Sequence, residues 1–114
     1  MLTVLKYPLP ELKDIRSETD ALGNLRAVLR LPNPADVIPI RMPYGARVVQ
    51  FNQEYGRPTI WALVETDSPV VEHRFVIVVT GNDLSDYSPN ELEHVGTISV
   101  LNDRLILHLF RIVP

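Results

Sequence analysis

Hydrophobic and polar residues alternate over short stretches of this chain, and turn-forming residues separate the stretches. Such alternation is typical of β-strands, whose successive side chains point to opposite faces. The predicted strands are Thr3–Tyr7, Val37–Met42, Arg47–Gln53, Pro58–Glu65, His73–Thr80, His94–Leu101 and Leu105–Val113. The sequence therefore predicts a mainly β fold, an antiparallel meander forming a compact sandwich or barrel-like sheet.

Two of these stretches, Phe75–Val79 and Leu105–Phe110, are apolar at almost every position. A strand that is apolar on both faces must be covered on both faces. In a chain of this size the cover is a second sheet, a helix from residues 18–30, or a second copy of the chain. We therefore expect a homo-oligomer.

Residues 11–36 allow two interpretations. Leu22, Leu25, Val28 and Leu29 have helical spacing, whereas Leu25–Leu31 alternates like a strand. We expect at most one short helix within residues 11–36, or a loop, followed by a strand that ends at Pro32.

Prolines and glycines add local detail. Pro39 inside a predicted strand indicates an edge position or a bulge. Glu54–Arg57 is predicted to be a hairpin loop, in which Gly56 is free to take a positive φ. Ser88–Glu91 predicts a single helical turn with Pro89 at its first position.

Composition narrows the class of protein. The chain has 114 residues, the size of one domain spanning 1–114. It has no cysteine, which excludes a disulfide scaffold and a thiolate metal site and fits a cytoplasmic protein. No apolar run approaches the ~20 residues that cross a bilayer, so we expect no membrane partner. The net charge of −3 argues against DNA or RNA polymers as partners, but a small anionic ligand needs only two or three local donors.

Few residues suggest chemistry. No histidine pair has metal-ligand spacing and no catalytic motif is present, so we expect neither an enzyme nor a cofactor. His73 and His94 are expected at the surface. His108, between Leu107 and Leu109, has either a structural role or a ligand contact. Asp83 and Asp86 are expected to cap turns.

Two further positions have both a structural and a functional interpretation. Trp61 either packs in the core or stacks on a base, an interaction that contributes ~1–3 kcal/mol. Thr80 and Gly81 follow the most apolar strand, and their turn offers backbone N–H groups to an anion.

Six short motifs, taken in order, resemble a family of small phage and prophage β-proteins. They are Lys6–Leu9, Met42–Ala46, Ile60–Val64, Arg74-Phe75 leading to Thr80-Gly81, Val95–Thr97 and Leu107–Phe110. This family is similar to the phage anti-CBASS sponge proteins, which sequester cyclic oligonucleotide signals of bacterial immunity. The chain departs from the family pattern at Asn82, where the pattern has His, and at Arg111, where it has Glu.

The resemblance implies a phage immune-evasion protein in the cytoplasm of the infected bacterium. It would bind a cyclic oligonucleotide without cleaving it. The motif positions carried over as ligand contacts are Trp61, Arg74, Thr80, Gly81, His108 and Phe110. The alternative is a protein–protein interaction module that grips a host protein, for example by strand addition at Val37–Met42.

Overall fold

The computed structural model describes residues 1–9, 15–19, 25–29, 37–100, 103 and 105–114. These residues form nine strands and one 3-10 turn, η1 (Pro89–Glu91). The strands are β1 (Leu2–Pro8), β2 (Ile15–Thr19), β3 (Leu25–Leu29), β4 (Ile38–Pro43), β5 (Arg47–Glu54), β6 (Arg57–Glu65), β7 (Val70–Val79), β8 (Leu92–Val100) and β9 (Leu105–Ile112). The predicted mainly β fold is confirmed.

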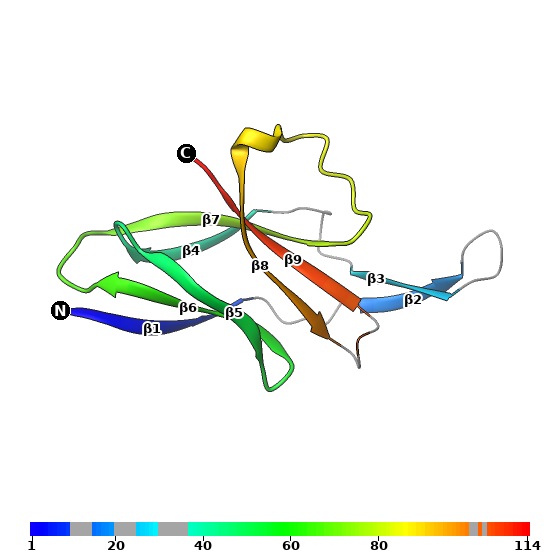
Figure 1. The fold of residues 1–114 in the computed structure, drawn as a ribbon, viewed down its shortest axis with the longest axis horizontal. Coiled ribbons are helices and arrows are strands. Elements are labelled where there is room, and N and C mark those ends of the chain that lie inside the picture. The colour runs from blue at the N-terminus through cyan, green and yellow to red at the C-terminus, as the bar shows by residue number, and fades with distance from the viewer. Residues whose placement is uncertain (10–14, 20–24, 30–36, 101–102, 104) are drawn as a thin grey trace.

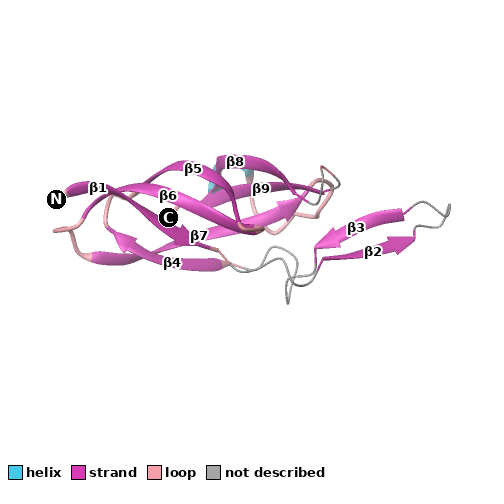
Figure 2. Cartoon of the chain, turned by 90° about the horizontal axis from the view of Figure 1, so that it is seen from below, coloured by secondary structure: helices cyan, strands magenta, loops and turns pink. Residues whose placement is uncertain are grey.

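Two antiparallel sheets pack against each other. One has the order β1-β6-β5, the other β4-β7-β9-β8, and β2 and β3 form a separate hairpin (Figure 1). Figure 2 shows β1 and β6 in one layer and β4 and β7 in the other, with the β2–β3 hairpin beyond one end. The order differs from a simple meander, because the chain changes sheet between β4 and β5 and again between β6 and β7.

The core lies between the two sheets. On β6 the inward residues Ile60, Ala62 and Val64 are fully buried, as their alternation with Trp61 and Leu63 predicts. The inner face of the four-stranded sheet contributes Phe75, Ile77, Leu107 and Leu109, among others. Each fully buried side chain of this kind stabilises the fold by roughly 1.5–3 kcal/mol.

The outer faces of β7 and β9 are covered to different extents. Val76 and Val78 point away from the core and are nevertheless buried, at 0% and 4% exposure. On β9, Ile106 is 36% exposed, and His108 and Phe110 are half-buried. Two-sided burial of β7 is thus achieved within one copy of the chain, so burial of this strand does not require an oligomer.

The structure resolves part of the ambiguity in residues 11–36. Leu25–Leu29 is a strand, so the helical interpretation is wrong for these residues. Ile15–Thr19 is also a strand and pairs with it, where a loop or helix was expected. The rest of that prediction falls on 10–14, 20–24 and 30–36, which lie outside the described residues.

Two predicted turns are confirmed. Tyr55 and Gly56 have φ values of 50° and 79°, the two positive values that a tight hairpin between β5 and β6 requires. At η1 the Glu91 N–H donates to the Ser88 carbonyl, and the Glu91 carboxylate accepts the Ser88 N–H at 3.0 Å. The hydrogen bond from the Ser88 N–H to the carboxylate holds the pKa of Glu91 below its ordinary value.

No helix in the described part of the chain is long and apolar enough to cross a membrane.

Candidate functional site

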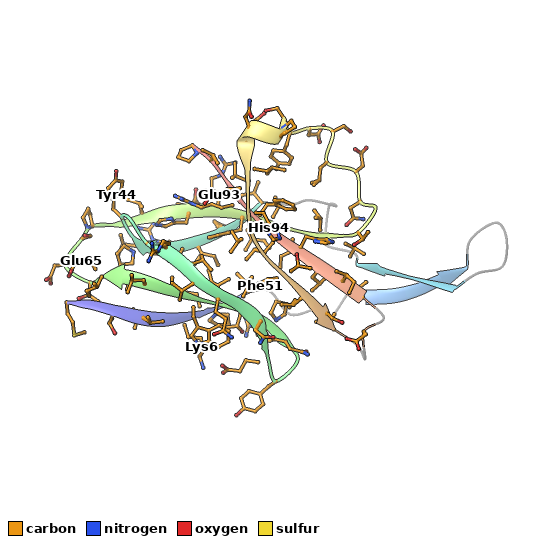
Figure 3. The ribbon with its side chains drawn as sticks, viewed as in Figure 1. Lys6, Tyr44, Phe51, Glu65, Glu93 and His94 are labelled. Atoms are coloured by element: carbon orange, nitrogen blue, oxygen red, sulfur yellow. The ribbon has the colours of Figure 1, made fainter. Side chains whose placement is uncertain are left out.

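A cleft of about 380 Å³ opens between the two sheets, a volume within the usual range for ligand pockets. The turn after β4 and the start of β5 form one wall, and β7, β8 and β9 form the other. The lining residues are Gly45, Ala46, Arg47, Val48, His73, Phe75, Glu93, His94, Val95 and Arg111. Glu93 and His94 extend from the first part of β8 (Figure 3).

Two arginines from different sheets give the cleft its charge. Arg111 occupies an inward position on β9, continuing the row of Leu105, Leu107 and Leu109. Arg47 begins β5 in the opposite sheet and also lines the cleft, although it lies opposite Leu63 in the register and so stands at the outer side of that sheet, at the cleft's rim. Among the described residues neither guanidinium forms a salt bridge, although Glu93 lies opposite Arg111 in the β8–β9 register. Both side chains therefore keep donors available for an anion.

His73 belongs to the wall of this cleft, so the expectation that it lies at the surface is wrong. It is only 5% exposed, and its Nε2 lies 3.2 Å from the Pro43 carbonyl, to which it donates. The reason is that β7 begins at Val70, three residues earlier than predicted, which places His73 inside the strand and on its inner face.

The outer face of the same sheet carries a row of hydrogen-bonded polar side chains. Thr80 Oγ1 is 2.7 Å from His108 Nε2, and His108 Nδ1 is 3.1 Å from Thr97 Oγ1. Thr97 Oγ1 is also 2.9 Å from His94 Nε2. The His94 ring meets Phe110 edge-on, with 5.5 Å between ring centroids. Both nitrogens of His108 thus have partners inside the protein, which favours its structural interpretation.

A β-bulge brings His94 and Thr97 onto one face. The β8–β9 register shifts between His94 and Gly96, so that Val95 is an extra residue. His94 then lies opposite Phe110 and Thr97 lies opposite His108. Regular alternation would put residues three apart on opposite faces, so the sequence pattern gives no signal for this pair.

Five of the six predicted ligand contacts lie on or next to one face of the four-stranded sheet. Arg74, His108 and Phe110 lie on the outer face of the four-stranded sheet, with Thr80 and Gly81 directly after β7. Trp61 lies on the outer face of the other sheet, half-exposed, between Lys6 and Gln50 in the register. The site assignment stays a prediction for all six.

The cleft arginines were not among the predicted contacts. A signal for Arg111 does exist in the sequence, since it is a charged residue at an inward position of an otherwise apolar strand. Arg47 had no such signal, because only the packing of the two sheets brings it near Arg111.

The loop after β7 is organised by its own hydrogen bonds. The Asn82 side chain accepts the Val79 N–H at 2.8 Å, and the Asn82 N–H donates to the Val79 carbonyl at 2.9 Å. Gly81 takes a φ of 93° between them. The Asp83 carboxylate accepts hydrogen bonds from the Ser85 hydroxyl and N–H, which lower its pKa. These contacts give Asn82 and Asp83 a turn-forming role.

Among the described residues, no group of three or more histidine, aspartate or glutamate side chains comes together in a way that could hold a metal ion.

Comparison with known proteins gives one family. No curated protein and no solved structure matches the chain. Residues 24–113 match a family described as a domain of unknown function, DUF7352, and this match includes both arginines of the cleft and all four residues of the polar row. Since the match covers most of its length, the chain belongs to the DUF7352 family.

Proposed function

We propose that this protein binds a small phosphate-bearing ligand, a cyclic oligonucleotide of bacterial defence, in the cleft between its sheets. The observation that carries the proposal is the pair Arg47 and Arg111, which reach the cleft from opposite sheets without a salt-bridge partner among the described residues. A guanidinium binds phosphate oxygens bidentately. Two arginines lining one cleft, one within it and one at its rim, suit a ligand with more than one phosphate.

We expect binding without cleavage, as the phage family resemblance implies, and the two arginines supply binding but no general base. An arginine stays protonated at all physiological pH values, so it stabilises an anion but does not accept a proton from water. The cleft contributes binding energy through charge and through its apolar floor, where Phe75 is fully buried. Sequestration of the ligand in the cytoplasm of an infected bacterium, as the phage family resemblance implies, is the biological role we propose.

The position of Arg111 supports an anionic ligand in particular. It is one of the two residues at which the chain departs from the phage family pattern, which has an acid there. An acid at this inward position would add a second carboxylate beside Glu93 and repel phosphate. With arginine the cleft has two guanidinium groups against one carboxylate.

The first test is thermal unfolding of the intact chain with a panel of cyclic di- and trinucleotides. A ligand at 100 times its Kd stabilises the folded state by ~2.7 kcal/mol, which raises the Tm of a domain this size by roughly 10 °C or more. Each nucleotide is then recovered and weighed by mass spectrometry. A shift with unchanged mass supports the proposal, a changed mass replaces it with an enzyme, and no shift with any nucleotide contradicts it.

The second test locates the ligand. We expect Arg47→Ala and Arg111→Ala each to weaken binding at least tenfold, because each removes a charge-assisted contact of more than ~1.4 kcal/mol. Arg74→Ala is the matched control, since Arg74 is an exposed arginine on the outer face of the same sheet. If instead Arg74→Ala and His108→Ala abolish binding while the cleft variants bind normally, the ligand lies on the polar outer face and the cleft assignment is wrong.

Strand addition at Val37–Met42 has less support as a second function. The Tyr44 N–H donates to the Pro69 carbonyl, so even-numbered residues of β4 bond to β7 and odd-numbered ones face the free edge. Pro39 and Pro43 are two of these outward residues and have no N–H. Within β4 (Ile38–Pro43) a guest strand would find a single outward donor, at Arg41.

A further inference from the structure

The free edge of β1 has unused hydrogen-bonding groups. The Leu9 N–H donates to the Pro58 carbonyl and the Thr66 N–H donates to the Met1 carbonyl, both at 2.9 Å. These pairs continue the β1–β6 register, in which odd-numbered residues of β1 bond to β6. The backbone N–H and C=O groups of Leu2, Val4 and Lys6 therefore point away from the sheet.

Apolar side chains accompany this edge on both faces. Leu2 and Val4 lie on the outer face and are 64% and 49% exposed. Leu5 lies on the inner face, opposite Ala62, and is still 41% exposed. The inner face of the sandwich is thus incompletely covered at β1. A neighbouring strand at this edge would bury apolar area on both sides of the sheet.

The charged residue of this edge is turned away from it. Lys6 crosses over β6 and its Nζ lies 2.6 Å from Glu54 Oε1 on β5 (Figure 3). A lysine on an edge strand ordinarily prevents pairing with another chain. Here the ammonium group is neutralised on the outer face of the sheet, so the backbone groups of the edge remain accessible.

The other edges of the two sheets are protected in different ways. On β4 two of the outward positions are Pro39 and Pro43, as described above. The edges of β5 and β8 lie against each other, with Gly96 next to Phe51. Among the described strands of the sandwich, β1 is the edge that keeps a run of free N–H groups, at Leu2, Val4 and Lys6, with its one outward proline, Pro8, at the end of the strand.

We propose that two copies of this chain pair antiparallel through β1 and form one continuous six-stranded sheet. Full overlap of Leu2–Pro8 with its copy puts Leu5 on the two-fold axis, opposite Leu5 of the second copy. Val4 then lies opposite Lys6 of the second copy, and Leu2 opposite Pro8. The inference is independent of the proposed ligand.

This register suits a second copy because it brings the outward-pointing N–H and C=O groups of the two β1 strands opposite each other. It pairs even-numbered with even-numbered residues, and those are the residues whose N–H and C=O groups point outward. Pro8, which has no N–H, falls at the end of the overlap, where its carbonyl still accepts from Leu2. Leu5 forms a non-hydrogen-bonded pair, in which the two side chains are close. Each Leu5 therefore covers the exposed inner face of the other copy, as an isologous two-fold contact requires.

A single-cysteine variant tests the register, because the native chain has no cysteine. Opposed residues of a non-hydrogen-bonded pair have Cα atoms ~4.5 Å apart, within the range that a disulfide spans. We expect Leu5→Cys to form a disulfide-linked dimer under mild oxidation, seen by non-reducing electrophoresis. Val49→Cys is the control, since Val49 is 51% exposed on β5, away from the proposed interface, and should form no disulfide-linked dimer. Crosslinking of Val49→Cys but not of Leu5→Cys would overturn the proposal.

Charge variants provide an independent test in solution. The proteins keep their native N-terminus, and light scattering measures their mass. The wild-type chain of 12.9 kDa should show twice that mass. Leu5→Lys and Leu5→Glu should each be monomeric, and their mixture should restore the dimer, because residue 5 faces itself across the axis. Recovery in the mixture also shows that both variants fold. A wild-type mass of 12.9 kDa at all concentrations would refute pairing through β1.

Val4→Pro tests the backbone contribution directly. It removes an outward N–H while leaving the β1–β6 hydrogen bonds intact, whereas Val4→Thr keeps the N–H. We expect Val4→Pro to weaken the dimer at least tenfold and Val4→Thr to change it little. Equal dimerisation of the two variants would contradict strand pairing.

Discussion

The two sides of the sandwich differ in how they end. On one side β5 and β8 meet, and a Cβ atom added at Gly96 would lie 3.0 Å from the Cβ of Phe51. On the other side β1 and β4 remain as separate edges (Figure 2). The difference shows that closure of a small sandwich depends on single residues at its edges. A glycine allows the close approach on the closed side, and prolines and an ion-paired lysine determine what the open side presents.

The largest expected effect is on the closed side. Phe51→Ala should lower the free energy of unfolding by about 3–5 kcal/mol, because the Phe51 side chain is buried where β5 meets β8. Urea unfolding measures the loss. Tyr44→Ala, at an aromatic residue 70% exposed, is the control and should change stability by about 0.5 kcal/mol or less. Equal losses in the two variants would show that the closed side contributes no special stability.

Gly96→Ala should have an intermediate effect. The new methyl group presses on the Phe51 Cβ, which is fixed to the backbone, so we expect a loss of about 1–3 kcal/mol. Combining it with Phe51→Gly, which removes that Cβ, should cost less than the sum of the two single losses, since the clash is then gone. Strict additivity in this double-mutant cycle would argue against direct contact as the cause.

The smallest effect on stability is expected on the open side, at Pro39. Pro39→Val should change the free energy of unfolding by less than about 1 kcal/mol, because residue 39 does not bond to β7. It should, however, create a new donor at the β4 edge. In a Leu5→Lys background, where β1 no longer pairs, we expect Pro39→Val to self-associate at high concentration. Sedimentation measures this association. A strictly monomeric double variant would show that proline is not what protects β4.

Much of the fold could be predicted from alternation alone. The strands from Arg47 onward, the edge position of Pro39 and the turn at Ser88–Glu91 follow from local patterns. The strand Ile15–Thr19 could not be predicted, because it has a single large apolar residue and owes its conformation to pairing with Leu25–Leu29.

The candidate site was less accessible to prediction, because it depends on register and sheet packing. Thr80, His108 and Phe110 were identified from motifs and do lie on one face. His94 joins them only through the bulge at Val95, and the two cleft arginines approach each other only through the packing of the sheets. Periodicity in a single strand contains neither kind of information.

The polar row on the outer face has a consequence for proton positions. The Thr97 hydroxyl has one hydrogen, so it donates to at most one of its two imidazole partners. When it donates to His94 and both imidazoles are neutral, His108 donates to Thr97 through Nδ1 and accepts from the Thr80 hydroxyl through Nε2. In that arrangement the hydrogen of His94, a residue that also lines the cleft, is on Nδ1. The orientation of a hydroxyl beside the Gly81 loop is thus coupled, through three strands, to which nitrogen of His94 carries hydrogen at the mouth of the cleft.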